Sequence, residues 1–177
     1  MTKRKFKIVL TGPESTGKTT LSELLAAHFD QTLCSEYARE YTTNIQRPIT
    51  LEDIRLMHDI QMNKEASSWK LTSKILFCDT DVLNFKIWIE HVFQQTPDWI
   101  LKSLSENKYD FYLLCFPDID WVPDGIRVNQ LDRMIIYEKF LEELENANAN
   151  YFIVRGKEEQ RFTNCVTAID NFLLLNS

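Results

Sequence analysis

Residues 9–25, VLTGPESTGKTTLSELL, contain two of the four glycines in this chain of 177 residues. At the average usage of Gly, about a dozen would be expected, so the placement of Gly12 and Gly17 calls for an explanation. With Lys18 and Thr19 they fit the pattern G-x-x-x-x-G-K-[ST], after an expected strand and at the start of an expected helix. This context predicts a phosphate-binding loop (P-loop) made of Gly12, Pro13, Glu14, Ser15, Thr16, Gly17, Lys18, Thr19 and Thr20.

Each part of the P-loop has a physical role in nucleotide binding. Glycines let backbone N–H groups converge on phosphate oxygens, and the helix N-terminus adds the positive end of its dipole. Lys18 is expected to reach the terminal phosphates and Thr19 to offer its hydroxyl to Mg²⁺. ATP and Mg²⁺ are therefore the expected cofactors. The alternative, an ordinary strand-to-helix turn, would need this spacing, Lys and Thr to coincide in a glycine-poor chain.

The composition is that of an ordinary globular protein, with 44% hydrophobic and 26% charged residues. We expect a single domain over residues 1–177. The net charge of −6 argues against general nucleic-acid binding, which needs a basic surface. No apolar run approaches the roughly 20 residues that span a bilayer, and no secretory signal is present, so we expect a cytoplasmic protein without membrane contacts. The widely spaced cysteines predict buried free thiols: Cys34, Cys78, Cys115 and Cys165.

Short apolar runs alternate with longer helical patterns along the chain. The runs are almost continuously apolar, which is typical of strands buried on both faces of a parallel sheet. This order predicts an α/β fold of P-loop NTPase type, with three αβα layers around a five-stranded parallel sheet. We expect strands at 6–10, 32–35, 75–79, 111–116 and 151–154, and helices at 18–29, 50–71, 81–94, 130–147 and 158–174.

Two acidic residues follow the most apolar strand, in KILFCDTD (74–81). Asp79 ends the strand, and Asp81 comes two residues later, at the sheet edge where open α/β sheets bind ligands. Asp79 is therefore the expected second Mg²⁺ ligand beside Thr19. The alternative is that these acids cap and charge the first turn of the next helix, and it weighs more for Asp81 than for Asp79.

The segments after the second and fourth strands favour a small-molecule kinase over a GTPase. DTDV (79–82) lacks the glycine of D-x-x-G, and NKYD (107–110) precedes a strand where a guanine-binding motif would follow one. Glu36 follows the second strand, where a kinase needs an acid to receive the proton of the acceptor hydroxyl. Residues 117–133, punctuated by Pro and Gly, form an expected lid that carries Arg127 and Arg133.

Several of these residues also have ordinary structural explanations. Arg39 has the spacing to pair with Glu36 on a helix surface, and Arg133 has the setting of a solvated helix face. Trp88 and Trp121 offer planar surfaces on which a base or pyridine ring could stack, although core packing is an equal alternative for Trp88.

Five segments resemble, in order and over nearly the whole chain, the ribosylnicotinamide kinase domain of NadR-type proteins and the wider group of related P-loop ATPase and kinase domains. The joint pattern is specific, whereas its P-loop alone would not be. The segments are GPESTGKTTL (12–21), EYAREY (36–41), DTDVLNFKIW (79–88), PDIDWVPDGIR (117–127) and VRGKEEQRF (154–162).

This resemblance implies phosphoryl transfer from ATP to the 5′-hydroxyl of nicotinamide riboside, which yields nicotinamide mononucleotide in NAD salvage. It implies that Lys18 and Thr19 hold the triphosphate and Mg²⁺, that Asp79 completes the metal site, and that Glu36 or Asp81 orients the acceptor hydroxyl. Arg127 and Arg133 would act from the lid, and Gly156 and Arg161 would flank the adenine. The residues expected around the acceptor are Glu36, Tyr37, Arg39, Asp81, Trp88 and Trp121.

The chain departs from the family pattern at one position. NadR enzymes often carry a Trp that stacks on nicotinamide just before the EY pair, and this chain has Ser35. Tyr37, Trp88 or Trp121 would then have to supply the stacking surface. Two alternatives therefore stay open: a kinase of another nucleoside, and a regulatory nucleotide-binding ATPase that contacts a partner through the lid.

NadR proteins commonly carry an adenylyltransferase domain and sometimes a DNA-binding domain. Because the chain begins five residues before its first expected strand, we expect neither domain in it. The sequence does not specify an oligomeric state.

Overall fold

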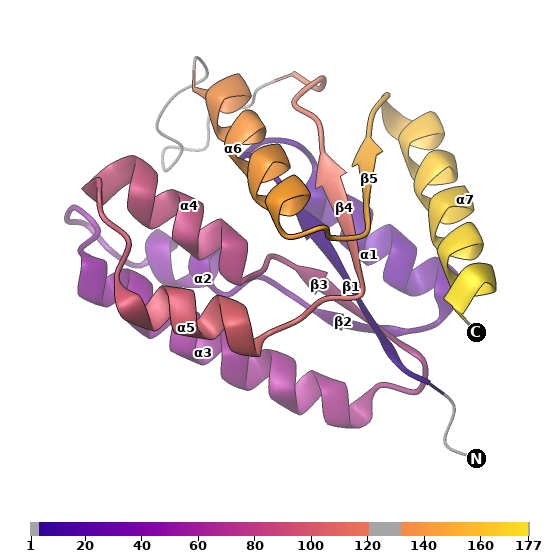
Figure 1. The fold of residues 1–177 in the computed structure, drawn as a ribbon, viewed down its shortest axis with the longest axis horizontal. Coiled ribbons are helices and arrows are strands. Elements are labelled where there is room, and N and C mark those ends of the chain that lie inside the picture. The colour runs from indigo at the N-terminus through magenta and orange to yellow at the C-terminus, as the bar shows by residue number, and fades with distance from the viewer. Residues whose placement is uncertain (1–3, 121–131, 177) are drawn as a thin grey trace.

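A computed structural model describes residues 4–120 and 132–176. Within these ranges the chain forms a five-stranded sheet in the order β2-β3-β1-β4-β5, and every neighbouring pair of strands is parallel (Figure 1). This confirms the expected α/β fold and each expected strand. The strands are β1 (Phe6–Thr11), β2 (Thr32–Cys34), β3 (Ile75–Asp79), β4 (Phe111–Cys115) and β5 (Tyr151–Val154).

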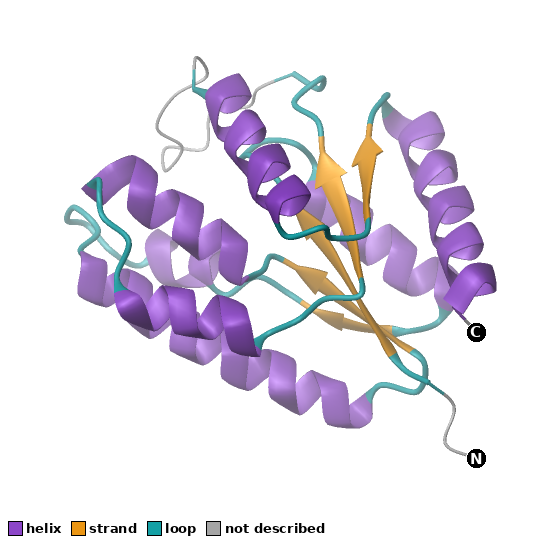
Figure 2. Ribbon diagram, viewed as in Figure 1, coloured by secondary structure: helices purple, strands orange, loops and turns teal. Residues whose placement is uncertain are grey.

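Helices cover both faces of the sheet (Figure 2). Two of them, α2 and α5, were not expected, and the other five lie where the periodicity predicts them. None of the helices within the described ranges is long and apolar enough to cross a membrane. The helices are α1 (Lys18–Phe29), α2 (Ala38–Thr43), α3 (Leu51–Leu71), α4 (Val82–Phe93), α5 (Asp98–Glu106), α6 (Arg133–Asn146) and α7 (Glu158–Asn176).

The central strand β1 shows how the two faces of the sheet are covered. Ile8 and Leu10 belong to a core cluster with residues of α1 and α7, whereas Val9 belongs to a cluster on which Trp69 of α3 packs. All three strand residues are fully buried, because successive side chains of a strand point to opposite faces. A strand buried on both sides reads as a continuous apolar run, which is what the sequence FKIVL predicts.

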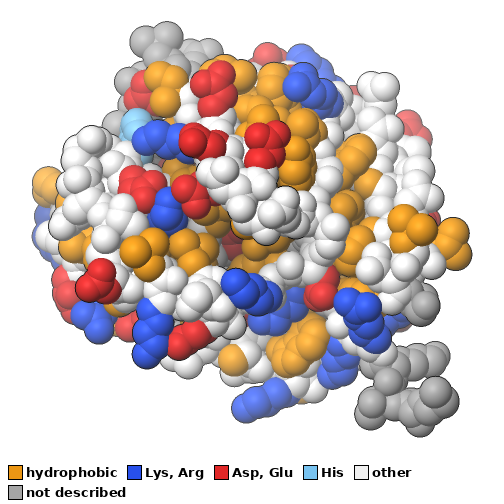
Figure 3. All heavy atoms as spheres, in the orientation of Figure 1, with side chains coloured by type: hydrophobic (Ala, Val, Ile, Leu, Met, Phe, Trp, Pro, Cys, Tyr) orange, Lys and Arg blue, Asp and Glu red, His pale blue; other side chains and the backbone are white. Residues whose placement is uncertain are grey.

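Charged pairs join the helices on the outer surface. The Lys86 ammonium on α4 lies 2.7 Å from the Glu143 carboxylate on α6 and 2.9 Å from Glu90. Figure 3 shows basic and acidic side chains mixed over this face of the molecule. The Lys86 side chain is only 10% exposed and both carboxylates are partly exposed, so these pairs are less screened by water than fully exposed ones, and they link α4 to α6.

Helix α3 begins at a well-defined N-cap that also holds the chain before it. Thr50 and Asp53 form a reciprocal capping box. The Asp53 carboxylate also pairs with Arg47 at 2.6 Å and accepts a hydrogen bond from the Tyr41 hydroxyl of α2 at 2.8 Å. These contacts lower the pKa of Asp53 well below its ordinary value. The short helix α2 is thereby tied to the rigid helix α3.

Gly12 lies directly against the neighbouring strand β4. Its φ is +122°, and a Cβ at this position would lie 2.9 Å from the carbonyl oxygen of Cys115. The obstruction is backbone in the middle of the sheet, so it has little freedom to move. Only glycine therefore fits where β1 leaves the sheet and the P-loop begins.

We expect Gly12→Ala to lower the free energy of unfolding by about 2–4 kcal/mol, since backbone strain and overpacking add. Gly156→Ala is the matched control: its φ is +93°, but its Cβ would meet only the flexible side chain of Gln160. That variant should lose about 1–2 kcal/mol. Urea denaturation measures both, and equal losses would contradict the proposed clash with β4.

Candidate active site

The P-loop joins β1 to α1 at the carboxyl edge of the sheet. Gly12, Ser15 and Gly17 have positive φ angles of 122°, 54° and 74°, and such turns gather successive N–H groups into a concave anion site. Helix α1 has Gly17 as its N-cap, with no side-chain cap and no acidic residue in its described first turn. Its first N–H groups and the positive end of its dipole therefore suit an anionic ligand.

Lys18, the first residue of α1, folds its side chain back across the P-loop. Its Nζ donates hydrogen bonds to the carbonyl oxygens of Gly12 at 2.9 Å and Pro13 at 2.7 Å. Its charge also lowers the pKa values of Glu36 and Asp79 against the larger effect of burial. The ammonium thus lies over the loop and within electrostatic range of both acids.

Arg133 supports the P-loop from α6. Only 8% of the residue is exposed, and its guanidinium donates to the Ser15 carbonyl at 3.0 Å and to the Ile119 carbonyl at 3.2 Å. The alternative of a solvated helix face is therefore wrong for Arg133. Its role in phosphoryl transfer stays a prediction.

Arg161 supports the loop from α7. It is 5% exposed, pairs with the Asp118 carboxylate at 2.8 Å, and donates to the carbonyl oxygens of Thr16 at 2.8 Å and Gly156 at 3.1 Å. Asp118 in turn accepts the N–H of Gly156 at 2.8 Å. These contacts join the P-loop to the loops after β4 and β5, so Arg161 acts structurally in this arrangement. Its expected place beside the adenine stays a prediction, as does that of Gly156.

Asp79 ends β3, the strand beside β1, and its side chain is 1% exposed. Neither carboxylate oxygen has a hydrogen-bond partner among the described residues, although the Thr19 hydroxyl is near enough to lower its pKa. Burial outweighs this and raises the pKa. A buried carboxylate with unsatisfied oxygens beside a hydroxyl fits Mg²⁺, which needs only one or two protein ligands beside water and phosphate. Among the described residues, no cluster of three or more His, Cys, Asp or Glu could hold a metal ion by protein ligands alone.

Asp81 is the N-cap of α4. Its Oδ1 accepts the N–H of Asn84 at 2.8 Å and the Thr11 hydroxyl at 3.1 Å, and burial raises its pKa to about 7. The helix-capping alternative is therefore correct for Asp81, and its orienting role stays a prediction. Thr80 between the two acids has a φ of +136°, a strained conformation of the kind found at functional sites.

Glu36 follows β2 and faces the same edge of the sheet. Burial raises its pKa, and the charges of Lys18, Asp79 and Arg39 all act on it. Tyr37 is the N-cap of α2, and Arg39 lies exposed in its first turn. The structure thus brings Glu36, Lys18 and Asp79 within electrostatic range of one another.

The aromatic residues expected around the acceptor divide into two groups. Trp88 is partly buried and packs against a core cluster between α3, α4 and α5, which agrees with the packing alternative. Trp121 and Arg127 lie outside the described residues, as does most of the lid expected at 117–133. Stacking on Trp88 or Trp121 and the action of Arg127 stay predictions.

Sequence reasoning missed Asp118 and Gln61. Asp118 looks like an ordinary loop acid, because its partners come from segments far away in the sequence. Gln61 continues the buried side of α3 after Ile54 and Met57. A polar residue at helical spacing within an apolar stripe was the signal that could have revealed it.

The NKYD segment (107–110) lies at the amino ends of the strands, opposite the carboxyl edge that carries the P-loop. Tyr109 donates from its hydroxyl to Glu65 at 2.8 Å, Glu65 pairs with Lys7 at 2.7 Å, and Asp110 accepts the N–H of Lys7 at 2.8 Å. This network ties α3 to the starts of β1 and β4. The segment therefore has a structural role far from the P-loop, as expected for a chance match to a guanine-binding motif.

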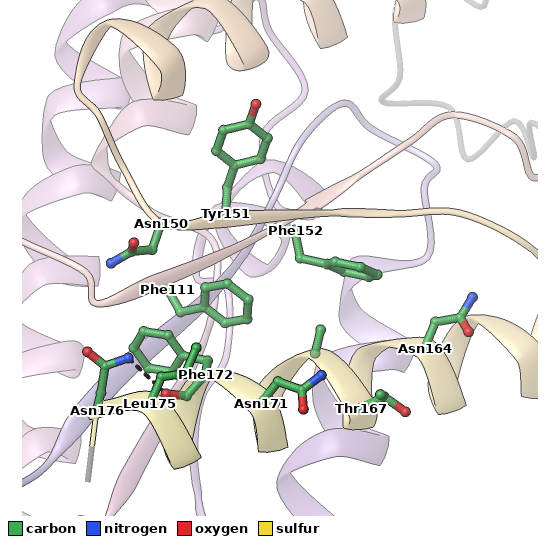
Figure 4. A pocket seen from close by; sticks show the side chains of 11 residues that line it. Phe111, Asn150, Tyr151, Phe152, Asn164, Thr167, Asn171, Phe172, Leu175 and Asn176 are labelled. Atoms are coloured by element: carbon green, nitrogen blue, oxygen red, sulfur yellow. Dashed lines mark hydrogen bonds between the residues drawn. The ribbon is translucent and has the colours of Figure 1, made fainter.

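A groove of about 550 Å³ lies between β5 and α7 (Figure 4). Its described lining consists of aromatic, aliphatic, Asn and Thr side chains, with Phe111 stacked on Phe172 at a centroid distance of 4.7 Å. None of these lining residues is charged, so the groove does not suit a triphosphate. The P-loop therefore stays the expected nucleotide site.

Comparison with known families gives one match over most of the chain. The family described as AAA domain matches residues 7–161. The trifunctional NAD biosynthesis/regulator protein NadR of Escherichia coli is 25% identical over 173 residues, and that of Salmonella typhimurium is 24% identical over 176. The chain spans 41% and 42% of the lengths of these relatives.

Solved structures with the same fold include two of NadR protein. The complex with NR has a TM-score of 0.83 at 22% identity, covering 95% of this chain and 51% of that one. The complex with NAD and AMP-PNP has a TM-score of 0.76 at 21% identity, covering 95% and 49%. Thymidylate kinase from Ehrlichia chaffeensis has a TM-score of 0.64 at 16% identity, covering 93% and 98%. The resemblance to NadR-type proteins is confirmed, and the fold is that of P-loop kinases.

We expect Arg161→Met to lower the free energy of unfolding by about 2–4 kcal/mol, because it leaves buried acceptors of three loops unpaired. Lys157→Met is the control, since Lys157 and its partner Asp120 are largely exposed, and it should change stability by less than about 0.5 kcal/mol. Denaturation curves and ATP-analogue titrations measure the effects. An Arg161→Met protein with normal stability but lost ATP binding would instead favour an adenine contact.

Proposed function

Because this chain belongs to the AAA domain family, we propose that its P-loop binds ATP with Mg²⁺ and that it phosphorylates the 5′-hydroxyl of a nucleoside, nicotinamide riboside above all. The observation that carries the proposal is the juxtaposition of the P-loop lysine with a buried acid, Asp79, and a partly buried acid, Glu36, at one sheet edge. A nucleotide-binding module needs Lys18 and Asp79, whereas Glu36 beside them supplies what a kinase needs in addition.

The proposed binding step uses the donors of the P-loop. Backbone N–H groups, the N-terminus of α1 and Lys18 hold the triphosphate, while Arg133 and Arg161 keep the loop in shape through the carbonyls of Ser15 and Thr16. Thr19 and Asp79 would hold Mg²⁺, which when bound neutralises charge on the phosphates. Little loop reorganisation is then needed when ATP binds.

The proposed chemical step transfers the γ-phosphoryl group. The 5′-oxygen of the nucleoside forms a bond to the γ-phosphorus, the bond from that phosphorus to the β,γ-bridging oxygen breaks, and ADP leaves. The hydroxyl proton passes to the Glu36 carboxylate. Burial raises the pKa of Glu36, which makes it a better base than an exposed carboxylate. Arg127 is proposed to stabilise the transferring group from the lid.

Nicotinamide riboside is proposed on the strength of the NadR relatives and of the NadR structure solved with NR. One observation favours a second candidate, the kinase of another nucleoside. Ser35 stands where a stacking Trp is common, and its carbonyl and hydroxyl oxygens accept hydrogen bonds from Lys64 at 3.2 and 3.3 Å. The position therefore offers polar groups where the family offers an aromatic ring.

Acceptor-dependent ATP turnover separates these functions. We expect ADP formation to rise at least about tenfold over the basal rate with nicotinamide riboside, and nicotinamide mononucleotide to appear in equal amount. A larger response to another nucleoside would replace the substrate. ATP hydrolysis unaffected by every nucleoside in the panel would refute the kinase function and favour a regulatory ATPase.

Substitutions of Asp79 and Glu36 should have different kinetic effects. Asp79→Asn should raise the Mg²⁺ concentration needed for half-maximal turnover, and excess Mg²⁺ should partly restore it. Glu36→Gln should keep ATP affinity but lower kcat by about 10²–10⁴-fold, the usual contribution of a general base. Steady-state kinetics over a Mg²⁺ series measure both. The assignment is wrong if Glu36→Gln abolishes ATP binding while Asp79→Asn leaves the Mg²⁺ dependence unchanged.

A further inference from the structure

Gln61 is a fully buried polar residue on α3, with 0% of its surface exposed. It occupies the apolar side of the helix, where an amide is costly unless all its polar atoms find partners. Its contacts therefore indicate why a glutamine, and not another Met or Ile, stands there.

Both ends of the Gln61 amide bind the turn that carries Glu36. Its Oε1 accepts the N–H of Tyr37 at 2.8 Å, and its Nε2 donates to the Ser35 carbonyl at 3.3 Å and the Cys34 sulfur at 3.4 Å. The partners fix the orientation of the amide, because a backbone N–H requires the oxygen and a carbonyl requires the nitrogen. The two backbone groups held in this way lie immediately before and after Glu36.

The Glu36 side chain depends on this support. Among the described residues no hydrogen bond restrains its carboxylate, so its position follows from the backbone. The preceding strand β2 has three residues and pairs only with β3 in the described sheet, which gives it little rigidity of its own. Helix α3, with 21 residues and a capping box, supplies a rigid frame through Gln61.

We propose that Gln61 is a positioning residue for phosphoryl transfer, one that fixes Glu36 against the acceptor hydroxyl. This inference rests on the proposed kinase function and deepens it. Gln61 acts through Glu36 and does not touch either substrate. Its loss should therefore slow the transfer step while leaving the ATP site intact.

The test is a double-mutant cycle between Gln61→Met and Glu36→Gln. Met has nearly the volume of Gln but neither donor nor acceptor for the turn. Gln61→Met alone should lower kcat by about 10–100-fold, the range expected for misplacing a catalytic group by about 1 Å, with the KM for ATP unchanged. In the Glu36→Gln background the same change should cost less than about twofold, because the group it positions is already gone.

Glu65→Gln is the matched control. It weakens the buried ion pair with Lys7 one turn further along α3 and should destabilise the fold without touching the turn, so its kcat should stay within about twofold of the wild type. If Gln61→Met does not fold, Gln61→Asn replaces it in the cycle, since the shorter amide cannot reach both partners.

Amide hydrogen exchange at Tyr37 keeps the inference separate from the kinase function. We expect exchange of this N–H to rise at least about tenfold more in Gln61→Met than in Glu65→Gln at equal global stability. A wild type without acceptor-dependent turnover refutes the kinase function and, with it, the positioning role, even if exchange behaves as expected. With an active wild type, unchanged Tyr37 exchange, or equal kcat losses for Gln61→Met in both backgrounds, overturns the role of Gln61 alone.

Discussion

The contact between Gly12 and the backbone of Cys115 is the constraint from which the site is built. Because no Cβ fits there, the P-loop starts in contact with β4 and is held close to the carboxyl edge of the sheet. The loop then comes within reach of the loops after β4 and β5. Arg133 and Arg161 use that proximity to bind the carbonyls of Ser15 and Thr16. The conformation of the loop is thus set by the whole sheet edge and not by its own glycines alone.

The acidic residues near the site differ in what their carboxylates bind. One oxygen of Asp81 accepts a hydrogen bond from the N-terminus of α4. Both oxygens of Asp118 accept hydrogen bonds, one from Gly156 before α7 and one from Arg161 in α7, so each acid holds secondary structure in place. Asp79 is buried without a partner among the described residues. A buried acceptor that the protein leaves unsatisfied is the one best suited to an ion or ligand. Asp81 also leaves its Oδ2 without a partner, but among these described acids only Asp79 leaves both carboxylate oxygens unpartnered.

Local patterns predicted the sheet, since each strand is a buried apolar run and the P-loop motif fixes the first of them. Helices α2 and α5 were not predicted because they have six and nine residues, too few for a clear helical period. The structural roles of Arg161 and Gln61 were not predicted from the sequence, for a different reason. Their partners, such as Thr16 and Asp118 for Arg161, come together only through the strand order, which no local spacing encodes.

Three of the four cysteines lie at or next to the carboxyl ends of strands β2, β3 and β4, and the fourth lies in α7. Burial raises the pKa of every one of these thiols, to about 11 for Cys34 and about 12 for Cys165. A thiol reacts with oxidants and alkylating agents as its thiolate. At neutral pH these sulfurs are therefore almost wholly protonated and shielded. The sheet edge gains small apolar side chains beside Asp79 and Glu36 without acquiring a redox-sensitive centre, so mild oxidative stress should leave the chemistry of this edge intact.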